Sequence, residues 1–267
     1  MIPIRDFNPT TRRPYVTVAI IVTCILVFFW QASLGPSAGQ QATMRFGFIP
    51  ALFFGHAAWP AGLDTIPSWA TLFTSMFMHG GFMHLAGNML YLWIFGNNIE
   101  DATGHVRYAL FYLLCGLAAA MAQAIPDPHS TIPMIGASGA ISGVLGAYLL
   151  LFPKAKVMVI IPIGFLFVQT LPAGWLLGFW IVFQLGSGFA SASNAGGGVA
   201  WWAHVGGFVA GMALIHLFRD KIRQISPTAI SAGVAKRRPK AGRSRIPNSK
   251  KDPQDRPKPT VERRRDP

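Results

Sequence analysis

The chain has 267 residues, of which 52% are hydrophobic and only 12% are charged. This composition excludes an ordinary water-soluble domain and indicates apolar segments that cross a lipid bilayer. The net charge of +13 lies mostly at the C-terminal end, since residues 219–267 carry 16 Lys and Arg against 5 Asp and Glu.

Six apolar segments follow one another along the chain. They cover residues 14–33, 82–98, 106–125, 138–152, 172–189 and 201–218. A further apolar stretch, residues 157–168, is interrupted by Pro162 and Gly164 and is too short to cross a bilayer, so we expect a re-entrant or interfacial connection there. The pattern predicts an all-α membrane protein, a bundle of six transmembrane helices followed by a disordered basic tail.

The first apolar segment raises the question of a cleavable signal peptide. Arg12 and Arg13 precede it, and residues 37–39 (SAG) resemble a cleavage site. Its apolar run is longer than that of a typical signal peptide, which favours an uncleaved first helix. We therefore divide the chain into an N-terminal segment 1–13, a membrane domain 14–218 and a tail 219–267.

The placement of basic residues predicts the orientation. With the N-terminus inside, the outer loops 34–70, 126–137 and 190–200 contain Arg45 as their only basic residue. Every inner loop is basic, with Arg12, Arg13, Arg107, Lys154, Lys156, Arg219, Lys221 and Arg223. This is the positive-inside pattern, and it places both termini in the cytoplasm.

The tail is rich in Pro, Ser and Lys and poor in aromatic residues, so we expect disorder from about residue 225. A solvated basic tail is attracted to anionic lipid headgroups, and we do not expect it to bind nucleic acid. The sequence leaves the oligomeric state open.

Polar residues from three predicted helices fall at one depth, near the outer face. Ser138 opens the fourth segment, and His204 lies in the first turn of the sixth. His84 and Asn88, four residues apart near the outer end of the second segment, share one helix face. This depth follows from the basic loop residues, so it is independent of the four polar residues themselves.

The segments that carry the serine and the histidine also carry small residues. Their spacing allows two helices to approach closely. They are Gly139, Gly143 and Gly146 on the fourth segment and Ala203, Gly207 and Gly211 on the sixth. We therefore expect these two helices to pack with their backbones in contact, which would bring Ser138 and His204 together.

This set of residues favours hydrolysis by an activated serine. A neutral His204 can accept the proton of the Ser138 hydroxyl. Asn88, His84 and the backbone N–H of Ser138 can stabilise the oxyanion that forms. Because no acidic residue lies at this depth, the sequence predicts a Ser-His dyad rather than a triad.

Each residue also has a simpler structural interpretation. A serine at a helix start is commonly an N-cap, and a membrane histidine commonly packs or belongs to a proton path. His79 and His84 could be metal ligands, but no Cys, Asp or Glu nearby completes such a site. We expect neither a metal nor a cofactor.

Three motifs in this order resemble the rhomboid intramembrane serine proteases. They are His79–Asn88 (HGGFMHLAGN), Gly136–Gly139 (GASG) and Ala203–Gly207 (AHVGG) followed by Gly211. Residues 72–77 and the pair Glu100-Asp101 with Gly104 are similar as well.

The resemblance implies Ser138 as nucleophile and His204 as base. It also implies an oxyanion hole formed by His84, Asn88 and the Ser138 amide, with His79 in support and Gly136 leaving room for the substrate backbone. The implied substrates are single-pass transmembrane proteins, cut near the outer face and often after a small residue. The six-helix arrangement resembles the basic bacterial form, which implies the bacterial inner membrane.

The sequence departs from many relatives at two places. The outer loop lacks their Trp-Arg pair and has Trp59-Pro60 and Trp69-Ala70 instead. Ser142 occupies the position, four residues after the nucleophile, where some relatives stack an aromatic ring on the base.

Two other functions are compatible with part of this pattern. One is a catalytically silent rhomboid-like protein that binds membrane clients, but such proteins lack the serine or the histidine. The other is a transporter or proton channel using His79, His84 and His204. It predicts polar residues that continue toward the cytoplasmic side, where the sequence has only Asn97 and Asn98 at a helix end.

Overall fold

The computed structural model describes residues 1–59, 61, 66–162, 166–191 and 199–219. Met1–Arg223 form a compact unit, which contains all of the described residues. The predicted tail 219–267 lies outside the described residues except for Arg219, and so does most of the predicted outer loop 190–200.

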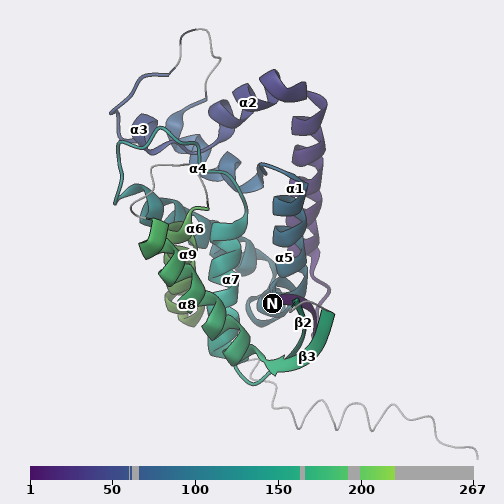
Figure 1. Cartoon of the computed structure of the whole chain (residues 1–267). Helices are drawn as coiled ribbons and strands as arrows, with labels where there is room; N and C mark the ends of the chain where they lie inside the picture. Colours follow the sequence, from purple (N-terminus) through teal and green to yellow (C-terminus); the bar gives the residue numbers. More distant parts are fainter. Residues whose placement is uncertain (60, 62–65, 163–165, 192–198, 220–267) are drawn as a thin grey trace, which may run out of the picture. The chain divides into compact units, whose positions relative to one another are not determined.

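Six helices occupy the six predicted apolar segments (Figure 1). They are α1 (Tyr15–Ser33), α5 (Phe82–Thr103), α6 (His105–Ala124), α7 (Ser138–Leu151), α8 (Ala173–Ser191) and α9 (Trp201–Phe218). By length and apolar composition, α1, α6, α8 and α9 can each cross a membrane. The 14-residue α7 is shorter, and α5 ends in a polar stretch. The predicted helical membrane architecture is confirmed, with four of the six helices long and apolar enough to cross a bilayer and a small β-sheet that the all-α prediction did not include.

Several short helices lie between α1 and α5, and the first three of them fall within the predicted outer loop 34–70. They are α2 (Gly35–Phe46), α3 (Pro50–Phe53), η1 (Ser68–Ala70), α4 (Thr71–Thr74) and η2 (Ser75–Phe77). Figure 1 shows α2 and α3 at one end of the bundle and the strands at the opposite end. The loop therefore has helical structure of its own.

The stretch for which we expected a re-entrant or interfacial connection belongs to a β-sheet. Strands β2 (Lys156–Pro162) and β3 (Leu166–Pro172) pair antiparallel, and β1 (Ile2–Asp6) adds to β2 in the order β1-β2-β3. Alternate residues of β2, Val157 and Val159, are fully buried in the core. The sequence analysis did not predict the sheet, because the β-branched run of β2 pairs with N-terminal residues that carry no strong strand signal of their own.

The helix α7 is the central element of the bundle, since every residue from Ala140 to Tyr148 is buried. Its C-terminal end is followed within five residues by β2. Its first residue, Ser138, therefore lies about 20 Å from the C-terminal end of the helix, toward the end of the bundle opposite the sheet.

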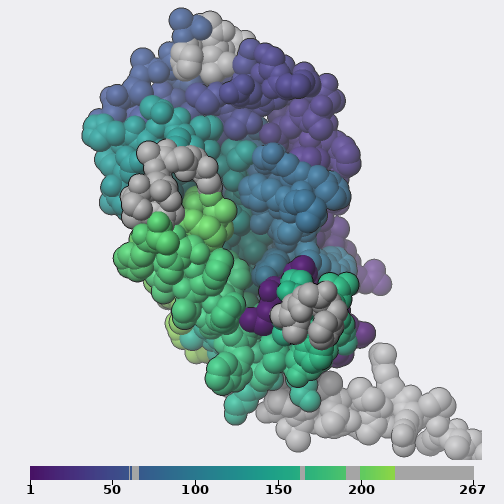
Figure 2. Space-filling model, viewed as in Figure 1, coloured from purple at the N-terminus to yellow at the C-terminus, as the bar shows by residue number. Residues whose placement is uncertain are grey.

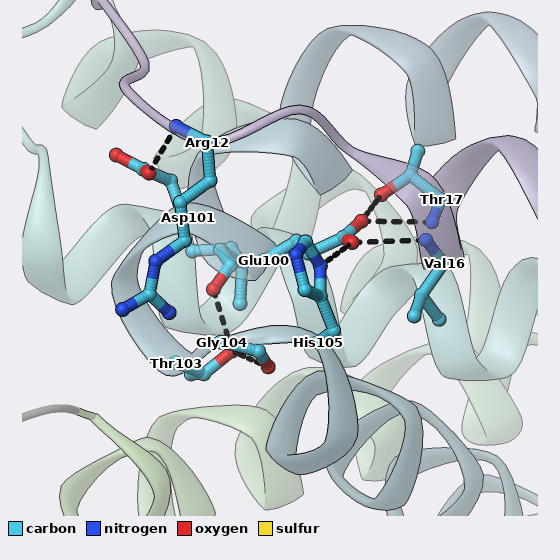
Figure 3. Close-up of polar contacts among 9 residues, drawn as sticks. Arg12, Val16, Thr17, Glu100, Asp101, Thr103, Gly104 and His105 are labelled. Atoms are coloured by element: carbon cyan, nitrogen blue, oxygen red, sulfur yellow. Dashed lines mark hydrogen bonds and ion pairs between the residues drawn. The ribbon is translucent and has the colours of Figure 1, made fainter.

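The buried carboxylate of Glu100 joins α5 to the start of α1 (Figure 3). It accepts hydrogen bonds from the backbone N–H groups of Val16 and Thr17 at 2.9 and 2.8 Å and from the Thr17 hydroxyl at 2.7 Å. His105 Nδ1 lies 2.6 Å from the same carboxylate. Because α1 has no N-cap side chain of its own, Glu100 satisfies the free N–H groups and complements the helix dipole.

Replacement of Glu100 by glutamine is expected to destabilise the fold by about 1–3 kcal/mol, because an amide cannot accept all of these bonds and leaves buried donors unpaired. The midpoint of unfolding in an SDS titration measures the effect. Asp127→Asn is the matched control, since Asp127 is exposed and, among the described contacts, only its backbone carbonyl accepts a hydrogen bond. Equal shifts in the two variants would contradict the anchoring role of Glu100.

Asp6 ties the sheet to the helices. Its Oδ2 accepts hydrogen bonds from Asn98 Nδ2 at 2.7 Å and from the Tyr148 hydroxyl at 2.9 Å. Burial raises the pKa of Asp6, and these hydrogen bonds only partly offset the shift. The folded state therefore favours the protonated carboxyl, and its stabilising contribution is lost as the pH rises through the raised pKa.

We expect the unfolding midpoint of the wild type to fall, as the pH rises above the ordinary aspartate pKa of about 4, more than that of Asp6→Asn, which has no proton to lose there. SDS titrations of both proteins across this range measure the difference. Identical pH dependence in the two proteins would contradict it.

Candidate active site

Ser138 and His204 are hydrogen-bonded to each other in the structure. Ser138 Oγ lies 2.8 Å from His204 Nε2. Ser138 is the first residue of α7, and the preceding Ala137 occupies the N-cap position, where no side-chain cap bond is made. The serine hydroxyl thus contacts an imidazole and does not cap the helix.

Glycines on α7 and α9 bring the two side chains together. A Cβ added at Gly207 would collide with the carbonyl oxygen of Gly139, and one added at Gly211 would collide with that of Gly143. Both pairs advance by four residues, so the two helices run parallel with their backbones in contact. This close packing places the start of α9, with His204, beside the start of α7.

His84 from α5 lies near the serine, beside Gly136. The backbone N–H of Gly80 donates to His84 Nδ1 at 3.4 Å, so a neutral His84 carries its proton on Nε2. A Cβ added at Gly136 would lie 2.9 Å from His84 Nε2 and 3.6 Å from Ser138 Oγ. Gly136 has φ +128°, a conformation that favours glycine. The structure thus gathers His84, Gly136 and Ser138 around one small space.

Asn88 and His79 accompany His84. Asn88 lies one turn further along α5 and is buried, and within the described chain its Nδ2 has no hydrogen-bond acceptor. An unpaired buried donor is costly unless it meets a partner during function. The ring centroid of the buried His79 lies 5.2 Å from that of His84, and its backbone N–H donates to Gln31 of α1 at 3.1 Å. His79 therefore packs beside His84 and holds no direct bond to Ser138 or His204 among the described contacts.

His204 is in contact with two residues of α8 that were not among the predicted site residues. Gln184 Oε1 lies 2.7 Å from His204 Nδ1, and the Trp180 ring centroid lies 5.9 Å from that of His204 at an interplanar angle of 39°. Gln184 is buried. A glutamine within an apolar membrane segment is the signal that could have identified it, because such polar residues face the bundle interior.

A pocket of about 50 Å³ adjoins Ser138. Its walls include small residues, among them Gly116, Ala119, Ala120, Gly139 and Ala203. The pocket has room for a small substrate side chain beside the Ser138 hydroxyl.

His79, His84 and Asn98, which the sequence also linked to a metal site or a polar path, have other contacts in the structure. Among these residues no three His, Cys, Asp or Glu side chains gather to hold a metal ion. Asn98, near the sheet end of α5, donates to Asp6 in the contact that anchors the sheet. Its side chain therefore has a structural partner in the sheet.

Comparison with known proteins identifies the family of this chain. A family model described as a rhomboid domain matches residues 67–221, which include α5 to α9 and every candidate site residue. The chain belongs to the rhomboid family.

Several curated proteins share this rhomboid similarity. Over 199 residues the chain is 31% identical to "Rhomboid protease GluP" of Bacillus subtilis (strain 168), covering 74% of this chain and 34% of that protein. "RHOMBOID-like protein 5" of Arabidopsis thaliana is 30% identical over 164 residues, 61% of this chain and 48% of that protein. "Inactive rhomboid protein 1" of Drosophila melanogaster is 36% identical over 80 residues, 30% of this chain and 6% of that protein. The chain thus spans a third to a half of the length of the first two.

Membership in this family and the apolar helices identify an integral membrane protein related to proteases that act within the bilayer. Because some relatives are named proteases and one is named inactive, family membership alone does not assign catalysis to this chain.

Proposed function

We propose that this rhomboid is an intramembrane serine endopeptidase that uses Ser138 and His204 as a catalytic dyad. The observation that supports the proposal most directly is the 2.8 Å contact between Ser138 Oγ and His204 Nε2. A catalytically silent member would not need this contact between a serine and a base. The glycine contacts of α7 and α9 support the same assignment, because they bring the two residues together.

In the proposed reaction, Ser138 Oγ attacks the carbonyl carbon of the scissile peptide bond while its proton passes to His204 Nε2. The tetrahedral intermediate then collapses, the C–N bond breaks, and His204 returns the proton to the leaving amine. Water, activated by His204 in turn, hydrolyses the ester formed on Ser138 and restores the hydroxyl.

The oxyanion of the intermediate needs donors that are already in place. We assign this role to His84 Nε2–H, Asn88 Nδ2–H and the backbone N–H of Ser138. The proton on His84 Nε2 follows from the Gly80 contact at Nδ1, and Asn88 Nδ2 is a buried donor without a described acceptor. The start of α7 adds free N–H groups and the positive end of its dipole. Gly136 leaves space beside these donors for the substrate backbone, and His79 supports His84.

The proposed substrates are single-pass transmembrane proteins whose helix unwinds near the outer face of the membrane. The small pocket beside Ser138 favours a small residue on the acyl side of the cut. The reaction needs no metal or cofactor.

We propose that the sheet end of the bundle faces the cytoplasm and that the protein resides in a bacterial inner membrane. Basic residues before α1, at the start of α6 and in β2 gather at this end, namely Arg12, Arg107 and Lys156. The positive-inside rule then places the N-terminus and the tail after α9 in the cytoplasm, where the tail would meet anionic headgroups.

Cleavage by the purified full chain in liposomes tests this function. The assay uses a panel of single-pass substrates with a small residue near the outer end of the transmembrane segment, and N-terminal sequencing locates the cut. We expect a new N-terminus inside that segment with the wild type and with Ser142→Ala, and none with Ser138→Ala. Equal cleavage by Ser138→Ala would contradict the proposal.

A further inference from the structure

His204 makes a hydrogen bond through each of its two ring nitrogens. Nε2 lies 2.8 Å from Ser138 Oγ, and Nδ1 lies 2.7 Å from Gln184 Oε1. An amide oxygen accepts hydrogen bonds and never donates them, so Nδ1 must carry the proton of a neutral His204. The lone pair of Nε2 then faces the Ser138 hydroxyl, which is the tautomer that a general base requires.

Gln184 is placed to hold this arrangement firmly. Its side chain is 5% exposed, and it reaches His204 from α8, which packs against α9. Figure 2 shows α8, in green, as an outer layer of the molecule on the face in view. The buried amide of Gln184 thus contacts His204 of α9 from a helix at the surface of the bundle. A buried amide bonded to a ring nitrogen restricts both the ring plane and the tautomer.

The aromatic rings around His204 complete its support. Trp180 of α8 lies against the imidazole at 5.9 Å, and Trp201 meets it edge-on at 6.3 Å and 89°. Ser142, at the position where some relatives carry a stacking aromatic residue, donates its hydroxyl to the Ser138 carbonyl at 2.7 Å. The orientation of the base thus comes from α8 and the start of α9, and Ser142 serves the backbone of α7.

We propose that Gln184 is a positioning residue that holds His204 in the reactive tautomer, so that Ser138, His204 and Gln184 act as a hydrogen-bonded row with a neutral amide as its third member. This inference rests on the proposed protease function. A neutral amide cannot balance the charge of the imidazolium as a carboxylate does, so its contribution is orientation and tautomer selection.

The test compares Gln184→Leu, Gln184→Glu and the wild type as full chains in liposomes. Gln184→Leu removes the acceptor at similar volume, and we expect kcat to fall about 10–100-fold while KM changes little, since substrate contacts remain. Gln184→Glu restores an acceptor at Nδ1, and we expect it to recover most of kcat with an altered pH profile. Gln169→Leu, the same exchange on the exposed strand β3, is the matched control and should cleave like the wild type.

A second readout does not depend on activity. In protein carrying ¹⁵N-labelled histidine, NMR shows which ring nitrogen of His204 is protonated, with its signals assigned by their loss in His204→Ala. We expect protonated Nδ1 in the wild type and a mixed population in Gln184→Leu. An unchanged tautomer or an unchanged kcat in Gln184→Leu would overturn the positioning role, as would a loss of kcat that glutamate does not restore.

The outcomes separate this inference from the proposed function. Wild-type protein with protonated Nδ1 but no Ser138-dependent cleavage would overturn the protease function, and the positioning role with it. Ser138-dependent cleavage that survives Gln184→Leu undiminished would overturn only the positioning role.

Discussion

The variants Ser138→Ala and His204→Ala are each expected to lose at least about 10⁴-fold in kcat, and the double variant is expected to lose no more than either alone. The serine cannot attack without a base, and the base has no function without the nucleophile, so the two losses overlap. Initial rates of cleavage in liposomes, with a transmembrane substrate that the wild type cuts, measure all four proteins.

The control for this comparison is Ser142→Ala. Ser142 lies one turn after Ser138 on the same helix, is buried, and bonds only within α7 among the described contacts. Its replacement should leave kcat within a few-fold of wild type. Losses in the two single variants that multiply in the double variant would contradict a dyad acting as one unit.

The second large effect is expected at the contact between α7 and α9. A Cβ at Gly211 would collide with the Gly143 carbonyl oxygen and lie 2.5 Å from its carbonyl carbon and Cα. Because the obstacle is backbone, Gly211→Ala must push the two helices apart. We expect a loss of about 1–3 kcal/mol in stability. We also expect a fall of ~10²-fold in kcat, because displacement of His204 by about 1 Å spoils its geometry with Ser138.

Gly178→Ala is the matched control for this contact. Gly178 lies within α8, and a Cβ there meets no atom within 4 Å in the described structure. The same glycine-to-alanine exchange should leave both the SDS unfolding midpoint and kcat near wild-type values. Equal losses at Gly178 and Gly211 would show that the effect belongs to helix glycines in general and not to this contact.

The meeting of Ser138 with His204 could be anticipated from the sequence because two independent patterns agree on it. Basic loop residues place both at the same depth, and glycines four residues apart give their helices a common contact face. The structure has this contact, with Gly207 against Gly139 and Gly211 against Gly143. The placement of basic residues and the spacing of glycines are local patterns, so a single sequence is enough to recognise them.

Other features depend on contacts between distant segments that no local pattern specifies. Strand β1 pairs with β2 more than 150 residues later, so neither the sheet nor the role of Asp6 in anchoring it could be deduced from periodicity. Gln184 could not be deduced from the absence of a carboxylate at this depth, because an amide oxygen also accepts the Nδ1 proton of a histidine.

The most direct test of the central claim is the identification of the residue that a fluorophosphonate probe modifies in the reconstituted protein. Such probes form a covalent bond with an activated serine, and peptide mass spectrometry locates the adduct. We predict an adduct on Ser138 in the wild type, no adduct in His204→Ala and an undiminished one in Ser142→Ala. An adduct on another serine, or an adduct on Ser138 that forms equally fast without His204, would contradict the account.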